Sequence, residues 1–132
     1  MSTEKKARIL VVDDDANVLV ALRERLQAEG FTVLEASTGE SAIRQAKSEI
    51  PDLILLDICL PDIGGGVVAS VLQEDPATDH IPIIYLKALF SKHEEAKYGR
   101  LVGGSKTLAK PIEMPKLIAE IESSLRAAAT LY

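Results

Sequence analysis

The sequence is poor in aromatic residues and has almost no cysteine. Phe, Trp and Tyr make up 4% of the 132 residues, with no Trp, so the core must be built from aliphatic side chains. One Cys cannot form an internal disulfide bond, which excludes a disulfide-stabilised secreted mini-protein and favours the reducing cytoplasm. No apolar run approaches the ~18 residues of a membrane-spanning helix. The first apolar run is also too short for a signal peptide.

Positive charge is in short supply as well. The chain has 20 acidic residues against 15 Lys and Arg, a formal net charge of -5. This balance disfavours direct binding to nucleic acid or to an anionic membrane surface. With 47% hydrophobic and 27% charged residues, the chain has the composition of a globular protein. We expect residues 1–132 to form a single domain with a core of about 8–125, and no output domain among them.

Short aliphatic runs alternate along the chain with segments of helical periodicity. Five runs are typical of β-strands: 9–12, 31–35, 53–56, 83–86 and 107–109. Five further segments are typical of helices: 18–26, 38–48, 68–75, 91–101 and 114–125. Such alternation predicts an α/β fold, a doubly wound parallel sheet of five strands with helices on both faces. In these folds the functional site lies beyond the carboxyl ends of the strands.

Charged residues follow four of the five predicted strands: Asp13 and Asp14, Asp57, Lys87, and Lys110. Two carboxylates ~5 Å apart at an effective dielectric constant of ~20 repel by roughly 3 kcal/mol. A divalent cation, a lysine or proton uptake must offset this repulsion, and oxygen ligands favour Mg²⁺ or Mn²⁺ over zinc. A single Asp after a strand is most often a helix cap, a role that suits Asp15 or Asn17. Capping alone does not account for charges at four strand ends.

Three pieces of the sequence together resemble the receiver domain of two-component response regulators, of the chemotaxis-regulator type. They are residues 9–14, Asp57 with Pro61 four residues later, and Lys110-Pro111. The resemblance covers about residues 8–125 and implies a flavodoxin-like (βα)5 fold. It implies a cytoplasmic signalling module that takes a phosphoryl group from a histidine kinase or phosphotransfer protein. Its affinity for a downstream protein or output domain then changes. Such a module is a monomer or weak dimer, and catalyses only its own phosphorylation and dephosphorylation.

The resemblance also implies roles for individual residues. Asp57 matches the phosphoacceptor, whose carboxylate becomes an acyl phosphate. Lys110 matches the lysine that pairs with the acceptor and then with the phosphoryl oxygens, and Pro111 matches a proline that follows a cis peptide bond. The ligands of Mg²⁺ (or Mn²⁺) are matched by Asp13, Asp14, Asp57 and the backbone carbonyl of Cys59. These roles suit phosphoryl transfer, which needs mainly positioning and charge stabilisation.

The sequence departs from the family at two switch positions and in one loop. Lys87 stands where the family usually has Thr or Ser, and Thr107 stands where it has an aromatic residue. Lys87 either pairs with Asp57 or the phosphoryl group, or points to solvent, or belongs to a different strand register. A lysine in the site implies an atypical switch without the usual hydroxyl–aromatic pair. In the loop after Asp57, Gly64 replaces an acid that would cap the next helix, at a cost near 1 kcal/mol.

Two other functions fit parts of the sequence. The first is a phosphorylation-independent pseudo-receiver, an interaction module that Lys87 holds in one state. The intact set of Asp13, Asp14, Asp57 and Lys110 favours a phosphorylated receiver over this module. The second is an aspartyl-phosphate hydrolase of the haloacid dehalogenase type, which also has an Asp after a strand. That class requires a second Asp two residues later, where this chain has Cys59.

Overall fold

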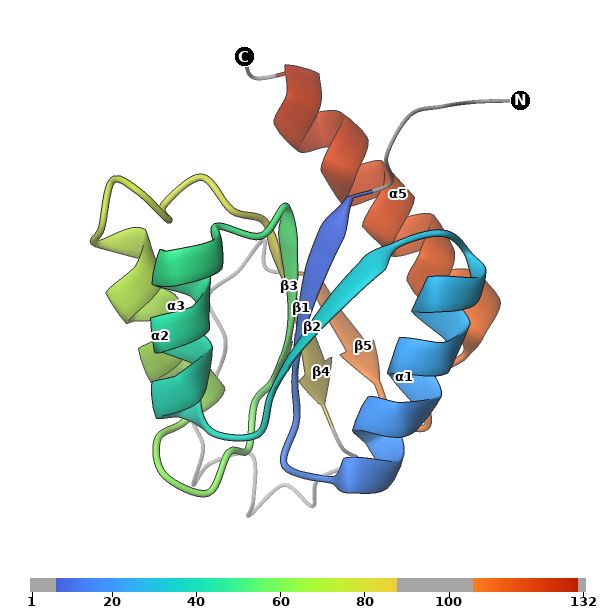
Figure 1. Cartoon of the computed structure of the whole chain (residues 1–132), viewed down its shortest axis with the longest axis horizontal. Coiled ribbons are helices and arrows are strands. Elements are labelled where there is room, and N and C mark those ends of the chain that lie inside the picture. The colour runs from blue at the N-terminus through green and yellow to red at the C-terminus, as the bar shows by residue number, and fades with distance from the viewer. Residues whose placement is uncertain (1–6, 88–105, 131–132) are drawn as a thin grey trace.

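The computed structural model describes residues 7–87 and 106–130, which form one sheet and the helices around it (Figure 1). The strands are β1 (Arg8–Val12), β2 (Thr32–Ala36), β3 (Leu53–Asp57), β4 (Ile83–Lys87) and β5 (Lys106–Ala109). The helices are α1 (Ala16–Ala28), α2 (Gly39–Glu49), α3 (Gly65–Gln73) and α5 (Met114–Thr130). The helix expected over 91–101 lies outside the described residues.

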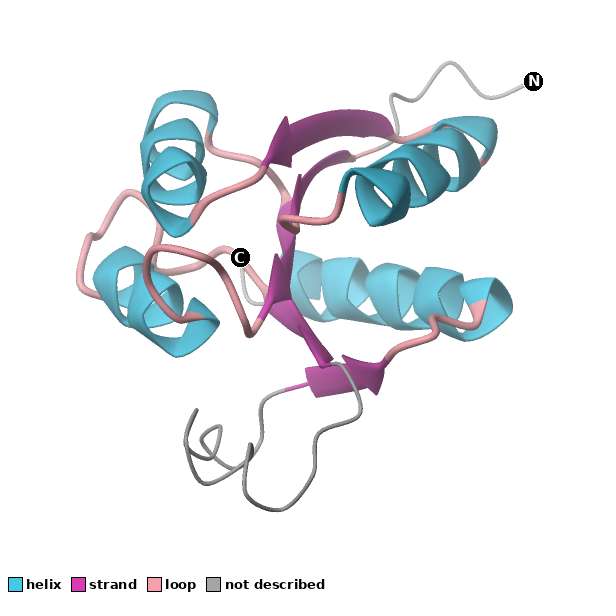
Figure 2. Cartoon of the chain, turned by 90° about the horizontal axis from the view of Figure 1, so that it is seen from below, coloured by secondary structure: helices cyan, strands magenta, loops and turns pink. Residues whose placement is uncertain are grey.

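The five strands are parallel and stand in the order β2-β1-β3-β4-β5. The chain steps outward from β1 to β2 and then returns to the other side of β1, so the strand order reverses between β1 and β3. Figure 2 shows the sheet on edge between two layers of helices. The predicted α/β fold, a doubly wound five-stranded parallel sheet with helices on both faces, is confirmed. Such a sheet places a functional site beyond the carboxyl ends of β1 and β3.

The strands form where they do because both faces of the sheet are buried. In β1, Leu10 and Val12 pack towards α2 and α3, while Ile9 and Val11 pack towards α1 and α5. All four side chains are fully buried, which explains why this strand is an unbroken aliphatic run. The less apolar β2 is an edge strand. The buried hydrophobic residues include only two aromatic ones among the described residues, Phe31 and Tyr85.

Local capping sets the starts of the helices that follow the strands. Asp15 precedes α1 and accepts a hydrogen bond from the backbone N–H of Asn17 at 2.9 Å, so Asp15 rather than Asn17 is the cap. Thr38 caps α2 in a capping box with Ser41. Gly64 precedes α3 and makes no side-chain cap hydrogen bond, as the replacement of an acid there predicts. Within the described residues, no helix combines the length and apolar character needed to cross a membrane.

Candidate functional site

Three carboxylates meet at the carboxyl ends of β1 and β3. Asp13 follows β1 directly and Asp57 ends β3. Each lies one residue beyond the register pair Val12 and Leu56, which places the two side by side. Each of Asp13, Asp14 and Asp57 offers a carboxylate oxygen, and these oxygens all lie within 4.8 Å of one another. Asp13 and Asp57 are buried and Asp14 is exposed, so the cluster opens to solvent on one side.

Lys110 brings a positive charge to these acids. Its Nζ lies 2.6 Å from Oδ2 of Asp13 and 3.7 Å from Oδ2 of Asp57. The backbone N–H of Lys110 donates to the carbonyl of Lys87 at 2.8 Å, and the Lys110–Pro111 peptide bond is cis. Sequence reasoning paired this lysine with the acceptor position, whereas its shorter contact is with Asp13. Lys110 therefore joins two of the three acids across the strand ends.

Burial and like charge make the ionised form of Asp57 unfavourable. Its pKa rises from 3.8 to about 6, first because the carboxyl is buried and second because Asp13 is negatively charged. Lys110 and the backbone N–H of Cys59, which donates to Oδ1 at 3.2 Å, both oppose this rise. Burial lowers the pKa of Lys110, but the hydrogen bond to Asp13 and the nearby acids outweigh it and raise that pKa overall. Two buried carboxylates and one ammonium leave an excess of negative charge.

The donor set fits a hard divalent cation. Within the described part of the chain, the side chains close enough to share an ion are those of Asp13, Asp14 and Asp57. The side-chain donors are therefore all carboxylate oxygens. Oxygen donors with one solvent-exposed member suit Mg²⁺ or Mn²⁺, which keep several water ligands, and do not suit zinc. Cys59 lies two residues after Asp57 on the adjoining loop and is half-buried.

The two predicted switch positions are on β4 and β5. Lys87 is the last residue of β4, half-buried, with its carbonyl held by Lys110, so the assumed strand register is correct. Thr107 is exposed and pairs in register with Tyr85 of β4. Sequence reasoning missed this neighbour: Tyr85 is a buried aromatic residue beside the position where the family's aromatic is absent. The pairing of strands was the only signal that could have found it.

The loop between Asp57 and α3 holds two further features of the site. A Cβ on Gly65 would lie 2.6 Å from the carbonyl oxygen of Asp57, so this position admits only glycine without a shift of the backbone. Asp62 is a residue whose contacts sequence reasoning missed. Its carboxylate accepts hydrogen bonds from the backbone N–H groups of Gly39 and Glu40, at 2.8 Å and 2.9 Å. No local pattern signals this contact, because the partners are distant in sequence.

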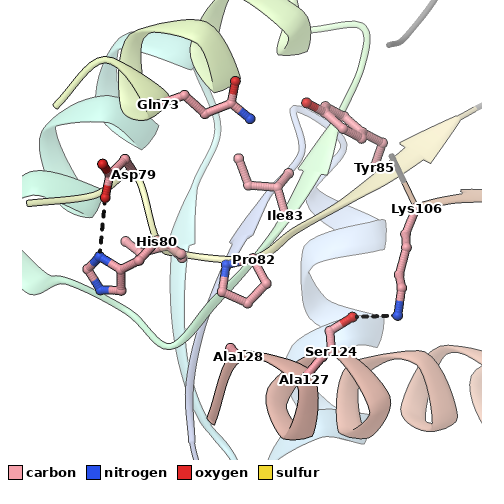
Figure 3. Close-up of a pocket in the computed structure, with 11 residues that line it drawn as sticks. Gln73, Asp79, His80, Pro82, Ile83, Tyr85, Lys106, Ser124, Ala127 and Ala128 are labelled. Atoms are coloured by element: carbon pink, nitrogen blue, oxygen red, sulfur yellow. Dashed lines mark hydrogen bonds and ion pairs between the residues drawn. The ribbon is translucent and has the colours of Figure 1, made fainter. Parts of the chain in front are cut away.

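A separate hollow lies at the opposite end of the sheet (Figure 3). It has a volume of about 380 Å³ and lies between the starts of β4 and β5, the end of α3 and the C-terminal half of α5. Lys106 lies 3.2 Å from Ser124 across it, and His80 lies 3.8 Å from Asp79. Since the strands are parallel, this hollow is remote from Asp57 and takes no part in the acidic site.

The comparisons with known proteins agree with this geometry. A family model described as the response regulator receiver domain matches residues 9–122. The chain belongs to this family. The resemblance found in the sequence is thereby confirmed, and receiver domains are signalling modules of two-component systems that interact with histidine kinases and downstream effectors.

Relatives of this receiver domain differ in how much of their own length the aligned region covers. Response regulator PleD of Caulobacter vibrioides is 40% identical over 121 residues, which are 91% of this chain and 26% of PleD. The chain thus spans about a quarter of the length of that relative. Polar-differentiation response regulator DivK of Brucella ovis is 32% identical over 117 residues, 89% of this chain and 94% of DivK. A crystal structure of a putative response regulator from Chloroflexus aurantiacus aligns with a TM-score of 0.80 and 30% identity, over 92% of this chain and 99% of that one.

Proposed function

We propose that this receiver domain accepts a phosphoryl group on Asp57, with Mg²⁺ (or Mn²⁺) bound beside it, and thereby changes its affinity for a partner protein. The observation that carries the proposal is the cluster of three carboxylates within 4.8 Å. Lys110 adds to it, with its ammonium 2.6 Å from Asp13 and 3.7 Å from Asp57. Nothing in the packing of a sheet requires three acids to meet in this way, and a bound cation would relieve their repulsion without protonating Asp57.

In the proposed reaction the carboxylate of Asp57 is the nucleophile. One of its oxygens forms a bond to phosphorus, while the bond from phosphorus to the imidazole nitrogen of a donor phosphohistidine breaks and the imidazole leaves. Asp13, Asp14, Asp57 and the carbonyl of Cys59 would hold the metal ion, which supplies positive charge to the phosphoryl oxygens when bound. Lys110 supplies a second positive charge from the end of β5 and needs only a small shift from Asp13. Attack of water on phosphorus later breaks the bond to Asp57, releases inorganic phosphate and returns the free carboxylate.

The switch that follows phosphorylation is proposed to be atypical, with Lys87 at its centre. Lys87 ends β4 and its carbonyl already accepts the N–H of Lys110, which links the two lysines through the backbone. Thr107 is exposed and offers no aromatic ring to move inward. We therefore expect Lys87→Thr to change the lifetime of the acyl phosphate or the affinity for the partner. Unchanged values of both quantities would contradict this part of the proposal.

Mass spectrometry after incubation with Mg²⁺ and acetyl phosphate tests the proposed phosphorylation directly. The wild-type domain is expected to gain one phosphoryl group, and Asp57→Asn is expected to gain none. Asp79→Asn is the matched control, because Asp79 is an exposed aspartate at the amino-terminal end of β4, and it should be phosphorylated like the wild type. A folded wild-type domain that gains no phosphoryl group would point instead to the phosphorylation-independent interaction module.

A further inference from the structure

The loop that follows Asp57 is closed at its base by a backbone hydrogen bond. We call residues 58–64 the acceptor loop. The backbone N–H of Gly65 donates to the carbonyl of Ile58 at 2.8 Å, which closes the base. Cys59 lies just beyond this closure. On the far side, Gly64 caps α3 without any side-chain hydrogen bond, and the glycines at 64–66 give the backbone unusual freedom.

The tip of the acceptor loop is fastened to the start of α2 by Asp62. Its Oδ1 accepts the N–H of Gly39 at 2.8 Å, and its Oδ2 accepts the N–H of Glu40 at 2.9 Å. These N–H groups belong to the first turn of α2 and have no partner inside the helix. The two hydrogen bonds also lower the pKa of Asp62. The carboxylate therefore acts as a helix cap supplied from a distant loop.

A local cap on the same helix is independent of the acceptor loop. Oγ1 of Thr38 accepts the N–H of Ser41 at 3.1 Å. Asp62 and Thr38 thus divide the free N–H groups of the first turn between them. Removing either one weakens the start of α2, but only Asp62 also holds the acceptor loop. This division provides a matched pair for experiment.

An apolar contact reinforces the same fastening. Ile63 packs in the core on the α2 and α3 side of the sheet. A Cβ on Gly39 would lie 2.3 Å from Cγ1 of Ile63 and 3.0 Å from Cγ2 of Val68. Gly39 therefore leaves the space that Ile63 fills. The loop tip is held by a polar contact at Asp62 and an apolar contact at its neighbour.

We propose that Asp62 is a positioning residue: by fastening the acceptor loop to the amino end of α2, it holds the backbone of Cys59 in place beside Asp57. Cys59 is the point of contact with the site, because its N–H donates to Asp57 and its carbonyl is a metal ligand in the proposed function. The expected effect of Asp62 on metal binding rests on that proposed function. The fastening itself is independent of it.

Two measurements on the wild type, Asp62→Ala and Thr38→Ala test the proposal. The first is the alkylation rate of Cys59, the single cysteine, in metal-free protein, which reports opening of the acceptor loop. The second is the Mg²⁺ dissociation constant from titration calorimetry. Both variants should lose a similar amount of thermal stability. Asp62→Ala should raise the alkylation rate about tenfold and weaken Mg²⁺ binding about tenfold, while Thr38→Ala leaves both within about twofold of the wild type. Equal effects of the two variants would overturn the proposal.

Two further variants separate position from charge. Asp62→Asn removes the charge but keeps one acceptor oxygen, so it should fall between wild type and Asp62→Ala in both measurements. Gly39→Ala keeps every charge and displaces Ile63, so it should also raise the alkylation rate. The proposal is wrong if Asp62→Asn weakens Mg²⁺ binding as much as Asp62→Ala with an unchanged alkylation rate. It is also wrong if Gly39→Ala folds and leaves alkylation unchanged.

The two measurements also separate this proposal from the proposed function. If the wild-type domain binds no Mg²⁺ and takes up no phosphoryl group, the proposed function fails, while the alkylation of Cys59 still tests the fastening. If the wild type binds Mg²⁺ and Asp62→Ala binds it equally well with unchanged alkylation, the positioning role fails and the proposed function stands.

Discussion

At the scale of single residues, the burial of Asp57 beside Asp13 sets how stability depends on pH. The pKa of Asp57 in the folded protein is raised from 3.8 to about 6, by burial first and by the charge of Asp13 second. A raised pKa disfavours the ionised form, so this destabilisation is absent below pH 3.8 and complete above about pH 6. We expect Asp57→Asn to raise the free energy of unfolding by about 2 kcal/mol at about pH 7.5 without divalent metal.

Urea denaturation at two pH values checks this expectation. The gain from Asp57→Asn should shrink towards zero as the pH falls to about 4, where the wild-type carboxyl is itself largely protonated. Glu24→Gln is the control, since Glu24 is exposed on α1 and its removal should have little effect at either pH. A gain of equal size at both pH values would show that the charge of Asp57 is not its cause.

Two lysines, Lys106 at the start of β5 and Lys110 just after its end, should contribute differently to the free energy of unfolding. Lys110 is the ion-pair partner of the fully buried Asp13, so Lys110→Met should lower the free energy of unfolding by about 3 kcal/mol in metal-free protein. Lys106 pairs with Glu120 at 3.2 Å, and both side chains are more than one third exposed. Lys106→Met should therefore cost less than about 1 kcal/mol. Chemical denaturation of the two variants side by side checks this difference in the free energy of unfolding. The difference should become smaller when Mg²⁺ is added.

At the scale of elements, the start of α3 has a close backbone contact at Gly65 but none at Gly66. A Cβ on Gly65 would lie 2.6 Å from the carbonyl oxygen of Asp57, and backbone atoms cannot yield cheaply. Gly65→Ala should therefore lower the free energy of unfolding by about 2 kcal/mol. A Cβ on Gly66 would meet nothing within 4 Å, so Gly66→Ala should raise it by about 0.5–1 kcal/mol through helix propensity. Urea denaturation compares them, and effects of the same sign would contradict the close approach at Gly65.

The elements themselves were largely predictable, and for a specific reason. Strands buried on both faces must be continuous aliphatic runs, so β1 and β3 stand out in the sequence. The cap at Thr38 is of the locally readable kind, because a hydroxyl just before a helical pattern acts on its own helix. The contact of Asp62 with Gly39 escaped prediction because it joins a loop to the start of a helix that is distant in sequence. Local rules carry no information about such pairs.

At the scale of the whole molecule, metal binding and folding should be coupled. The proposed ligands Asp13 and Asp57 come from the ends of two separate strands, so the site exists only in the folded chain. Mg²⁺ at about 100 times its dissociation constant should then raise the free energy of unfolding by about 2.7 kcal/mol. Thermal denaturation over a Mg²⁺ series checks this in the wild type. The increase in melting temperature should be lost in Asp13→Asn and kept in Asp79→Asn. A wild-type melting temperature that does not change with Mg²⁺ would argue against the site.

The sequence by itself determined which residues could form the site. Carboxylates after two aliphatic runs and a lysine after another had to meet at one edge of the sheet, because parallel strands end on the same side. Lys87 and Thr107 likewise stood out as departures from the family. Composition and periodicity sufficed for this, since burial and helical spacing act on neighbours along the chain.

Only the tertiary structure decided how those residues are arranged. The strand order set Asp13 beside Asp57 and Thr107 beside Tyr85. It also gave Lys110 its closest partner, Asp13 rather than Asp57. Contact distances such as 2.6 Å and 3.7 Å between segments far apart in the chain follow from packing, which no local pattern encodes. The pKa of Asp57 and the fastening of its loop follow from those distances, and so does the chemistry proposed for this site.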